Sequence, residues 1–353
     1  MSKWEEKRLE DIIDVNPPVK LKKGESYPFI DIDKVSPTRR SVTNEEVKVY
    51  DGQSSSKFCD GDTVFSRITP CLENRKIAKV AIEGDAAFGS TEFYVFRAKK
   101  KKADARFTYY LTSSDAVVLP AINSMTGASG RQRADKRFIQ RLKLNLPDLP
   151  TQERIADILS AYDDLIEANN HRIELLEQTA QELYREWFVR FRFPGYENAK
   201  FEDGIPEGWS YVRFGKAIDI IDGDRGVNYP KQEEFYPEGD CLFLNAGNVT
   251  SKGFNFSACS YITKEKDSIL RKGKLQHGDV VLTTRGTVGN VAFYNETMTF
   301  SEMRINSGMV ILRNLGVVSP EYIYTSLHHE YLQKLMTMYA SGSAQPQLPI
   351  MDM

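Results

Sequence analysis

The sequence has few of the features that define secreted, disulfide-bonded or membrane proteins. Its 353 residues include only four cysteines, none in a Cys-x-x-Cys pair: Cys59, Cys71, Cys241 and Cys259. That number is too small for a disulfide framework and indicates a reducing compartment. No apolar run approaches the roughly 20 residues of a membrane span. The charged start Lys3-Trp4-Glu5-Glu6-Lys7 does not resemble a signal peptide. We therefore expect a cytoplasmic protein.

Residues arranged for catalysis are also scarce. The four histidines lack metal-ligand spacing, so we expect no metal site. Asn16-Pro17-Pro18-Val19 is similar to the Asn-Pro-Pro-aromatic motif of adenine methyltransferases, but valine replaces the ring that would stack on a flipped base. Glu46-Val47-Lys48, with Asp33 upstream, is similar to a nuclease carboxylate set, although such triplets are common by chance. We therefore expect no active site in this chain.

The net charge of −2 does not indicate a nucleic-acid-binding protein, but the distribution of charge is uneven. Residues 1–150 contain 27 Lys and Arg against 21 Asp and Glu, a net charge of +6. Residues 151–200 and 201–353 each have a net charge of −4. A basic N-terminal part favours a polyanionic partner, whereas a solvated surface imbalance is the simpler alternative. We interpret the acidity of 151–200 as the solvated face of a helix.

The chain contains two similar halves. Trp4 and Trp209 open them at an offset of 205 residues, and the later matches lie at offsets of 215 to 217. In order, the first-half segments that recur are Gly61-Asp62-Thr63-Val64-Phe65-Ser66-Arg67, Phe93-Tyr94-Val95-Phe96-Arg97, Phe107-Thr108-Tyr109-Tyr110 and Gly127-Ala128-Ser129. The matching segments of the second half are Gly278-Asp279-Val280-Val281-Leu282-Thr283-Thr284-Arg285, Met309-Val310-Ile311-Leu312-Arg313, Tyr322-Ile323-Tyr324 and Gly342-Ser343-Ala344. A conserved order of this kind indicates an internal repeat.

Each half combines short strands with a few helices. Residues 62–65 and 279–282 are β-prone runs that follow a glycine, and 93–96 and 309–312 are apolar runs of strand length. Residues 320–338 have helical spacing of apolar side chains, which predicts one helix. We expect two mixed α/β domains, residues 1–148 and 196–353, joined by a helical region over residues 149–195.

The connecting region has the strongest structural pattern in the sequence. Pro147-Asp148-Leu149-Pro150 predicts an extended entry, Thr151 a helix cap, and Pro194-Gly195 the end of the helix. A heptad stripe then continues over four heptads, which is typical of a coiled coil. The stripe consists of Leu159, Tyr162, Ile166, Asn169, Ile173, Leu176, Ala180, Leu183 and Trp187. Asn169 either fixes the register of a partner helix or lies at an exposed edge.

Two diverged modules joined by a rigid helix could read two different sequences along one duplex. From Thr151 to about Arg190 the helix would be about 60 Å long, whereas one turn of DNA spans about 34 Å. This pattern predicts a bipartite, asymmetric DNA site. The alternative is a protein-interaction scaffold whose coiled coil assembles partners without reading DNA.

Four segments of the connecting region, which together cover nearly 50 residues, carry a specific resemblance. They are Leu149-Pro150-Thr151-Gln152-Glu153-Arg154-Ile155-Ala156-Asp157-Ile158-Leu159-Ser160, Asp163-Asp164-Leu165-Ile166-Glu167-Ala168-Asn169, Ile173-Glu174-Leu175-Leu176-Glu177 and Leu183-Tyr184-Arg185-Glu186-Trp187-Phe188-Val189-Arg190-Phe191. This region resembles the central region of specificity subunits of Type I restriction-modification enzymes. The two flanking halves would be the family's target-recognition domains.

The resemblance implies a subunit without catalytic activity that selects a site on double-stranded DNA. It would dock modification subunits, which methylate adenine with S-adenosylmethionine, and restriction subunits, which use ATP and Mg to cut unmodified DNA. The family has a second long helix after the second domain, yet only 11 residues follow Gly342 here. We therefore expect a C-terminally truncated form, and we hypothesise that it self-associates through residues 155–187.

Candidate DNA-contacting residues lie in glycine-flanked loops that occur in both halves, where backbone and side chains can approach a groove. A plain hairpin turn or a flexible loop is the alternative for each. The run Lys99-Lys100-Lys101-Lys102 is more typical of a solvated turn, although it could attract phosphate. The candidates are Arg67, Arg75, Lys76, Arg131 and Arg133 in the first half, and Arg225, Arg285, Thr287, Asn290, Gln345 and Gln347 in the second.

Overall fold

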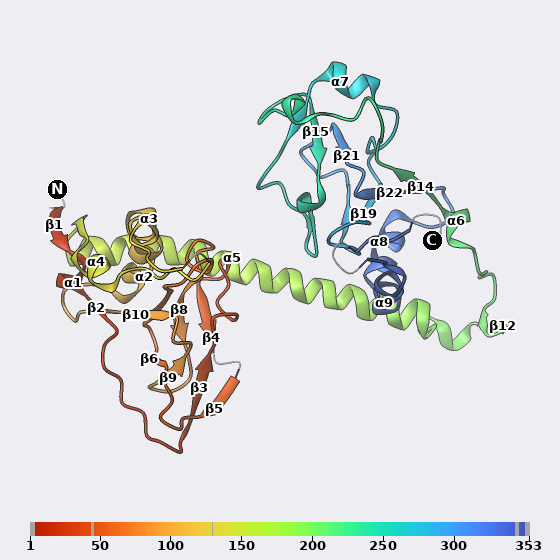
Figure 1. Cartoon of the computed structure of the whole chain (residues 1–353). Helices are drawn as coiled ribbons and strands as arrows, with labels where there is room; N and C mark the ends of the chain where they lie inside the picture. Colours follow the sequence, from red (N-terminus) through yellow and green to blue (C-terminus); the bar gives the residue numbers. More distant parts are fainter. Residues whose placement is uncertain (1–3, 44–45, 129, 343–345, 350–353) are drawn as a thin grey trace. The chain divides into compact units, whose positions relative to one another are not determined.

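The computed structural model describes residues 4–43, 46–128, 130–342 and 346–349. The chain divides into two compact units, Met1–Ile173 and Glu174–Met353, and the boundary between them falls inside one long helix, α5 (Leu149–Tyr184) (Figure 1). The mixed α/β class and the long central helix are therefore confirmed. The boundaries at residues 148 and 195 stay a prediction. In the described part of the chain, every helix is too short or too polar to cross a bilayer.

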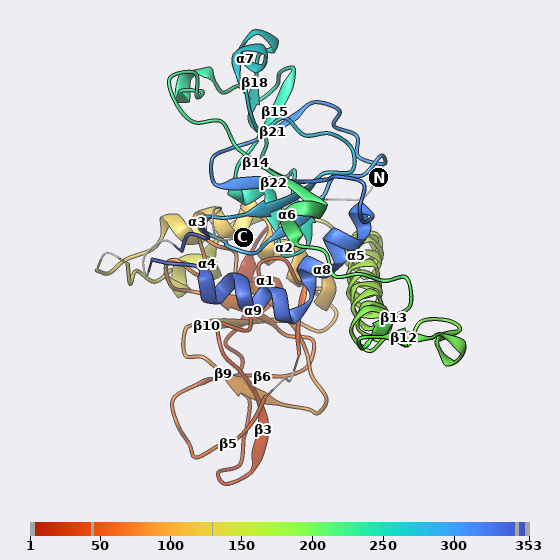
Figure 2. The same cartoon turned by 90° about the vertical axis from the view of Figure 1, so that its right-hand side faces the viewer.

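The first unit is built in layers, which Figure 1 and Figure 2 show from two sides. A five-stranded sheet of order β2-β10-β7-β8-β4 has helices on one face and a four-stranded sheet of order β5-β3-β9-β6 on the other. Side chains of β10 alternate between the two cores, as the two-residue period of a strand requires. Tyr94 and Phe96 pack toward the helices, whereas Phe93 and Val95 pack toward the second sheet.

The first unit consists mainly of short strands, with a few short helices. Its strands are β1 (Glu5–Arg8), β2 (Ile13–Val15), β3 (Ser26–Ile30), β4 (Ser41–Thr43), β5 (Glu46–Val49), β6 (Ser56–Phe58), β7 (Thr63–Ser66), β8 (Ile77–Ala81), β9 (Ala87–Gly89), β10 (Phe93–Ala98) and β11 (Lys143–Leu146). Its short helices are α1 (Leu9–Ile12), α2 (Ala105–Ser113), α3 (Asp115–Asn123) and α4 (Lys136–Arg141). Strands β1 and β11 form a separate antiparallel pair.

The second unit repeats this arrangement. Its sheet of order β14-β22-β19-β20 corresponds to β2-β10-β7-β8, and the parallel pair β15 and β21 corresponds to β3 and β9. Its strands are β12 (Phe201–Glu202), β13 (Ile205–Pro206), β14 (Ile218–Asp222), β15 (Cys241–Leu244), β16 (Val249–Thr250), β17 (Gly253–Phe254), β18 (Tyr261–Ile262), β19 (Val280–Thr283), β20 (Val291–Phe293), β21 (Met303–Ile305) and β22 (Met309–Asn314). Its helices are α6 (Phe214–Ala217), α7 (Lys264–Ile269), α8 (Pro320–His328) and α9 (Glu330–Tyr339), with short 3-10 turns between them. The predicted internal repeat is confirmed at the level of strand order.

A buried aspartate and an arginine form the same ion pair in each unit. Asp62 is 2% exposed, and Arg97 donates to both of its carboxylate oxygens at 2.7 and 2.6 Å. In the second unit Asp279 is 1% exposed and receives two hydrogen bonds from Arg313 at 2.9 and 2.7 Å. A buried carboxylate requires such partners. The pair therefore ties the start of β7 or β19 to β10 or β22.

The structure corrects the prediction of one helix over residues 320–338. Helices α8 and α9 are separate because His329 is extended, with φ −67° and ψ 136°, and its ring accepts a hydrogen bond from the Tyr331 amide. Ser114 breaks α2 from α3 in the same way, with φ −76° and ψ 159°. The apolar spacing continues across the break, so periodicity alone does not reveal it.

The predicted start of the central helix is also wrong, whereas its expected end near Arg190 is confirmed. Helix α5 begins at Leu149, so Thr151 is not its cap, and the Asp148 carboxylate instead accepts a hydrogen bond from the Thr151 amide at 3.2 Å. Pro150 lies in the first turn, where no intrahelical partner for an N–H is needed. The α-helix ends at Tyr184 and a π-helical turn, Arg185–Val189, follows, so the helix stops before Pro194-Gly195.

The acidic face of α5 is more than a solvated surface, which corrects the interpretation from charge alone. In the first unit Arg106 binds Asp157 at 2.7 Å, the Tyr110 hydroxyl donates to Asp163 at 2.6 Å, and Arg40 binds Asp164 at 2.5 Å. The buried side chain of Gln152 donates to the carbonyl of Pro147 at 2.9 Å. These contacts orient the helix on the first unit through its polar side.

Candidate nucleic-acid interface

Two loops that are distant in sequence meet in the first unit. The loop after β7 forms a bridge between Ile68 and Arg133, and the Ala134 amide donates to the carbonyl of Arg67 at 2.8 Å. Thr126 and Arg133 are themselves paired, which closes the loop that carries Arg131. The two predicted groups of basic residues therefore belong to one surface.

The second unit repeats this junction. Arg285, which follows β19, forms a bridge with Gln347, and the Leu348 amide donates to the carbonyl of Thr284 at 2.9 Å. Ser341 and Gln347 are paired in the same way as Thr126 and Arg133. The predicted Gln345 lies outside the described residues. The repeat thus places equivalent loops at equivalent positions of both sheets.

Two of the predicted arginines in the first unit share one carboxylate. Arg133 binds Glu92 through two nitrogens, at 2.6 and 2.9 Å, and Arg67 binds the same side chain at 3.2 Å. The hydrogen bond from Arg133, followed by the charge of Arg67, holds the pKa of Glu92 below its ordinary range. The cluster has a net charge of +1 and both guanidinium groups are partly exposed. Glu92 therefore fixes the orientation of these arginines without cancelling their charge.

Sequence reasoning missed Glu92. It directly precedes β10, and the carbonyl of Glu92 accepts a hydrogen bond from the Arg67 amide at 2.9 Å, as the antiparallel register of β7 and β10 requires. A comparison of the two halves could have drawn attention to this position, because Gly308 stands in the second half where Glu92 stands in the first. The carbonyl of Gly308 accepts a hydrogen bond from the Arg285 amide at 3.1 Å. Among the described residues, Arg285 therefore has no neighbouring carboxylate equivalent to Glu92.

The other candidates in the first unit differ in how freely they could reach a ligand. Arg75 donates to the carbonyl of Ser113 at 3.1 Å and forms an ion pair with Asp115. Lys76 donates to the carbonyl of Ile32 at 3.0 Å. Arg131 is exposed and has no ion pair within residues 4–43, 46–128, 130–342 and 346–349. Of these three, Arg131 has the side chain most available for contact.

The loop between β19 and β20 is a tight turn, as its glycines predict. Gly286 and Gly289 have φ of 75° and 93°, values that favour glycine. Arg285 is half-buried and forms no ion pair with another described residue, while Thr287 is exposed at the tip. Asn290 donates its side-chain amide to the carbonyl of Val249 at 3.0 Å, so it holds the turn. Its DNA contact stays a prediction.

Arg225 and Gln347 complete the candidates of the second unit. Arg225 lies after β14, where it pairs with Asp222 at 3.1 Å and donates to the carbonyl of Ser307 at 3.3 Å. Gln347 is exposed beside Arg285. Around Arg285 the described part of the second unit thus presents a guanidinium without a carboxylate partner and neutral polar side chains. The first unit presents a fixed arginine pair instead.

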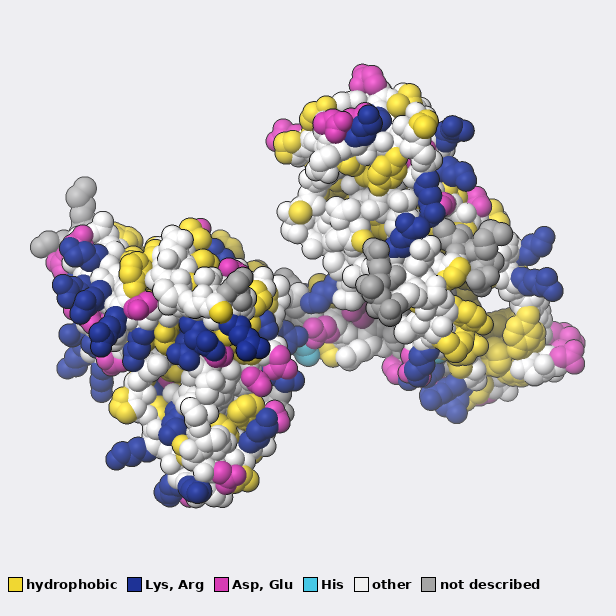
Figure 3. Space-filling model, in the orientation of Figure 1, with side chains coloured by type: hydrophobic (Ala, Val, Ile, Leu, Met, Phe, Trp, Pro, Cys, Tyr) yellow, Lys and Arg dark blue, Asp and Glu magenta, His cyan; other side chains and the backbone are white. Residues whose placement is uncertain are grey.

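Charge is distributed unevenly over the surface. Lys and Arg side chains are numerous on the visible face of the first unit (Figure 3). Lys100, Lys101 and Lys102 are exposed, whereas Lys99 donates to the carbonyl of Glu10 at 2.5 Å. Because phosphate attraction depends on exposed positive charge, the first three are suited to non-specific contact with a backbone.

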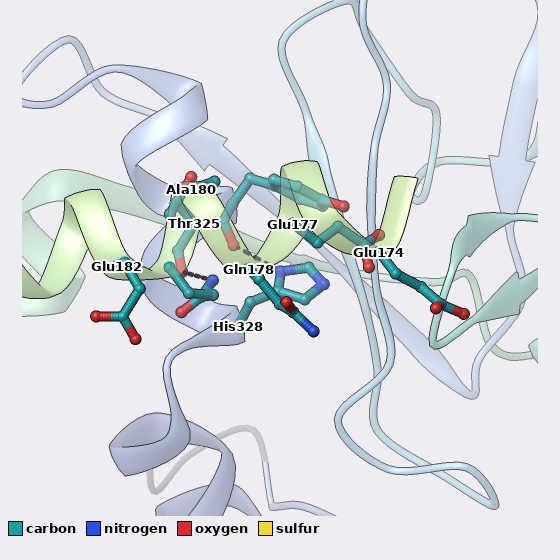
Figure 4. Close-up of a pocket in the computed structure, with 9 residues that line it drawn as sticks. Glu174, Glu177, Gln178, Ala180, Glu182, Thr325 and His328 are labelled. Carbon is teal, nitrogen blue, oxygen red and sulfur yellow. Dashed lines mark hydrogen bonds between the residues drawn. The ribbon is translucent and has the colours of Figure 1, made fainter. Parts of the chain in front are cut away.

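One hollow of the second unit is unsuited to DNA. It has a volume of about 360 Å³ and lies between α5 and α8, where Glu174, Glu177 and Glu182 surround it (Figure 4). Gln181 donates to the carbonyl of Thr325 at 3.2 Å across it. Since three carboxylates repel phosphate, this hollow reflects how α5 packs on the second unit.

All nine residues of the predicted heptad stripe are exposed. Tyr162 is 66% exposed and Leu176 62%, although both are large apolar side chains. The others are Leu159, Ile166, Asn169, Ile173, Ala180, Leu183 and Trp187. An apolar stripe of this length is typical of a helix that packs against another helix.

The two units share one scaffold but present different loop side chains. This arrangement is typical of proteins with two related recognition modules. Residues 1–178 match the family model described as the Type I restriction modification DNA specificity domain, and the chain belongs to this family.

Named relatives agree with this assignment. The MjaVIII specificity subunit of Methanocaldococcus jannaschii is 27% identical over 236 residues, which cover 64% of this chain and 53% of that protein. The MjaIX specificity subunit of the same organism is 23% identical over 99% of this chain and 81% of its own length. This chain thus spans about half the length of the first relative. The crystal structure of a Type I S subunit from M. genitalium has the same fold, with a TM-score of 0.51, 14% identity, and coverage of 96% of this chain and 79% of that one.

Proposed function

We propose that this chain is the non-catalytic subunit that selects the DNA site of a Type I restriction-modification enzyme. The observation that carries the proposal is the repeat with divergent loops. Each unit places a loop pair at the same end of its own, corresponding sheet. The first presents Arg67 and Arg133 fixed by Glu92, and the second presents Arg285, which has no carboxylate partner among the described residues. Two scaffolds with different side chains suit a bipartite, asymmetric site on double-stranded DNA.

Helix α5 is suited to two further roles in this proposal. With 36 residues it would be about 54 Å long at about 1.5 Å per residue, which is enough to set the spacing between two half-sites. Its exposed stripe would dock the modification subunits. These would methylate adenine with S-adenosylmethionine, and restriction subunits that use ATP and Mg would join them. We expect this chain to bind none of these cofactors.

An electrophoretic mobility shift with a random-sequence duplex library tests the proposal. The chain and its modification subunits are mixed with the library, and the bound fraction is sequenced after several rounds. The expected result is enrichment of two short motifs separated by an unspecified spacer. Binding without enrichment of any sequence would refute site selection by this chain.

A protein-interaction scaffold is the second candidate, and the exposed stripe on α5 favours it. Such a scaffold needs the helix but not the paired arginine loops. Arg67→Ala with Arg133→Ala separates the two functions. If the chain is a scaffold, this variant still binds its partners and its binding to DNA is unchanged. If the chain is a recognition subunit, the variant still binds its partners but loses sequence selection at one half-site.

A further inference from the structure

Strand β14 of the second unit extends further along its sheet than the corresponding strand β2 of the first unit. Strands β14, β22 and β19 lie side by side (Figure 1). The last residue of β14, Asp222, lies opposite Val310, which is the second residue of β22. The last residue of β2, Val15, lies opposite Phe96, which is the fourth residue of β10. Because β22 corresponds to β10, β14 continues for two residues beyond the point where β2 ends.

Two prolines account for the earlier end of β2. Pro17 and Pro18 directly follow Asn16 and have no backbone N–H with which to continue a ladder of hydrogen bonds. Asn16 has a φ of 56°, and its side-chain oxygen accepts a hydrogen bond from the Val95 amide of β10 at 2.8 Å. The Asn-Pro-Pro segment, which is similar to a methyltransferase motif in sequence, therefore has a structural role here, since it ends a strand.

The longer strand brings the loop after β14 to the end of the sheet that carries Arg285. The last residues of β14 and β19 face neighbouring residues of β22 at this end. The residues that precede β22 contact both of the loops that follow. The carbonyl of Gly308 accepts a hydrogen bond from the Arg285 amide at 3.1 Å, and the carbonyl of Ser307 accepts one from the Arg225 side chain at 3.3 Å. The loop of Arg225 is therefore a neighbour of the loop of Arg285.

Contacts at its base fix the loop of residues 223–229. A side chain at Gly223 would place its Cβ 2.1 Å from the carbonyl oxygen of Asn306, so the two backbones pack directly on each other. The Asp224 carboxylate accepts a hydrogen bond from the Arg271 amide at 2.6 Å. The tip of the loop is thus presented from a defined base.

An apolar side chain stands at this tip. Val227 is 94% exposed, the highest value among the large apolar side chains of the described residues. Gly226 precedes it with a φ of 121°, a conformation that favours glycine. In the major groove of DNA, the 5-methyl group of thymine is the apolar group that base edges present, and small apolar side chains contact it. An exposed valine between two arginine-bearing loops is suited to this contact.

We propose that residues 224–228 form a third recognition loop of the second unit, in which Val227 packs against the 5-methyl group of a thymine. The inference rests on the proposed function, since it assigns one base contact within the same DNA site. Arg225, which pairs with Asp222 at 3.1 Å, lies beside the phosphate backbone in this arrangement. Because the Asn-Pro-Pro segment ends β2 early, the contact belongs to the half-site of the second unit alone.

Duplexes that contain deoxyuridine test the proposal, because uracil differs from thymine only in lacking the methyl group. The chain and its modification subunits are bound to the duplex enriched in the mobility-shift selection, and each thymine on both strands is replaced in turn. The expected result is binding that is about fourfold weaker for one of these replacements, which corresponds to the loss of one buried methyl group. The Val227→Ala variant should not distinguish thymine from uracil at that position.

Val317→Ala is the matched control. Val317 is 50% exposed and follows β22, so it lies at the opposite end of the same sheet. This variant should distinguish thymine from uracil as the parent chain does. Both substitutions remove apolar atoms that face solvent, so both variants should fold like the parent, and thermal unfolding followed by circular dichroism checks this.

Several results would overturn the inference and leave the proposed function intact. They are a selected sequence without thymine, equal binding of every uracil duplex by the parent chain, and discrimination that survives in Val227→Ala. Loss of discrimination in Val317→Ala as well as in Val227→Ala would also count against it, because the effect would then not belong to this loop. Selection of no sequence at all would overturn the inference and the proposed function together.

Discussion

Replacing Arg285 and Arg313 separates recognition from stability within the second unit. Arg285 is half-buried, lies on the β19–β20 turn and has no ion pair with another described residue. Arg313 donates two hydrogen bonds to Asp279, whose side chain is nearly inaccessible to water. The two arginines thus have the same chemistry in different surroundings.

The expected free-energy changes follow from these surroundings. Arg313→Ala leaves a buried carboxylate without its counter-charge, which typically costs about 3–5 kcal/mol, and the lower end applies because the Arg313 side chain is 27% exposed. Arg285→Ala removes no internal ion pair, so the free energy of unfolding should change by less than about 1 kcal/mol. If Arg285 reads guanine, discrimination at one base pair should fall by about 1–3 kcal/mol.

Two assays measure these quantities. Urea denaturation gives the free energy of unfolding of each variant, and competition between the selected duplex and single-base variants gives discrimination at each position. The expected Arg285→Ala variant is as stable as the parent and loses preference at one position of one half-site. An unchanged position profile would remove Arg285 from the recognition surface, and an Arg313→Ala variant of full stability would refute the role assigned to the buried pair.

The remaining predictions concern the helix, the arginine cluster and the lysine run. The exposed stripe predicts that the chain self-associates and that Ile166→Asp weakens this, whereas Leu165→Asp, next to the stripe, does not; light scattering that finds a monomer at all concentrations would contradict it. The arginine partners of Glu92 lower the pKa of its carboxyl group. The stabilising contribution of this carboxylate is therefore present above pH 4.5, which is its ordinary pKa, and disappears as the pH falls through the lowered pKa. Glu92→Gln should therefore flatten the acid side of a stability–pH profile, and a parallel profile would argue against the cluster. Replacing Lys100 and Lys101 by alanine should reduce the slope of log K against log salt by up to about 0.9 for each phosphate that is no longer neutralised, with base preference unchanged; an unchanged slope would show that this run lies away from DNA.

Several parts of the fold were predictable because local pattern and tertiary packing agree. The glycine-flanked β-prone runs form β7 and β19, since these central strands are buried on both faces and consist mainly of apolar or β-branched side chains. The heptad stripe correctly predicted a long helix, because its spacing is incompatible with any other regular element. The order of matches between the halves correctly predicted the repeat.

Other features depend on contacts that periodicity does not contain. The break at His329 is a single extended residue within an uninterrupted apolar spacing. The acidic side chains of α5 resemble a solvated face until the positions of Arg40 and Arg106 are known. Glu92 is one acidic residue in a loop, and its role depends on the register between β7 and β10.

We propose that two modules on one chain read two different DNA sequences. Mapping of methylated adenines in cells that carry this chain with its modification subunits, before and after Arg285→Ala, is the most direct test. We expect one asymmetric motif of two parts with an unspecified spacer, of which only one part becomes degenerate in the variant. A continuous or palindromic motif, or loss of specificity in both parts together, would contradict it.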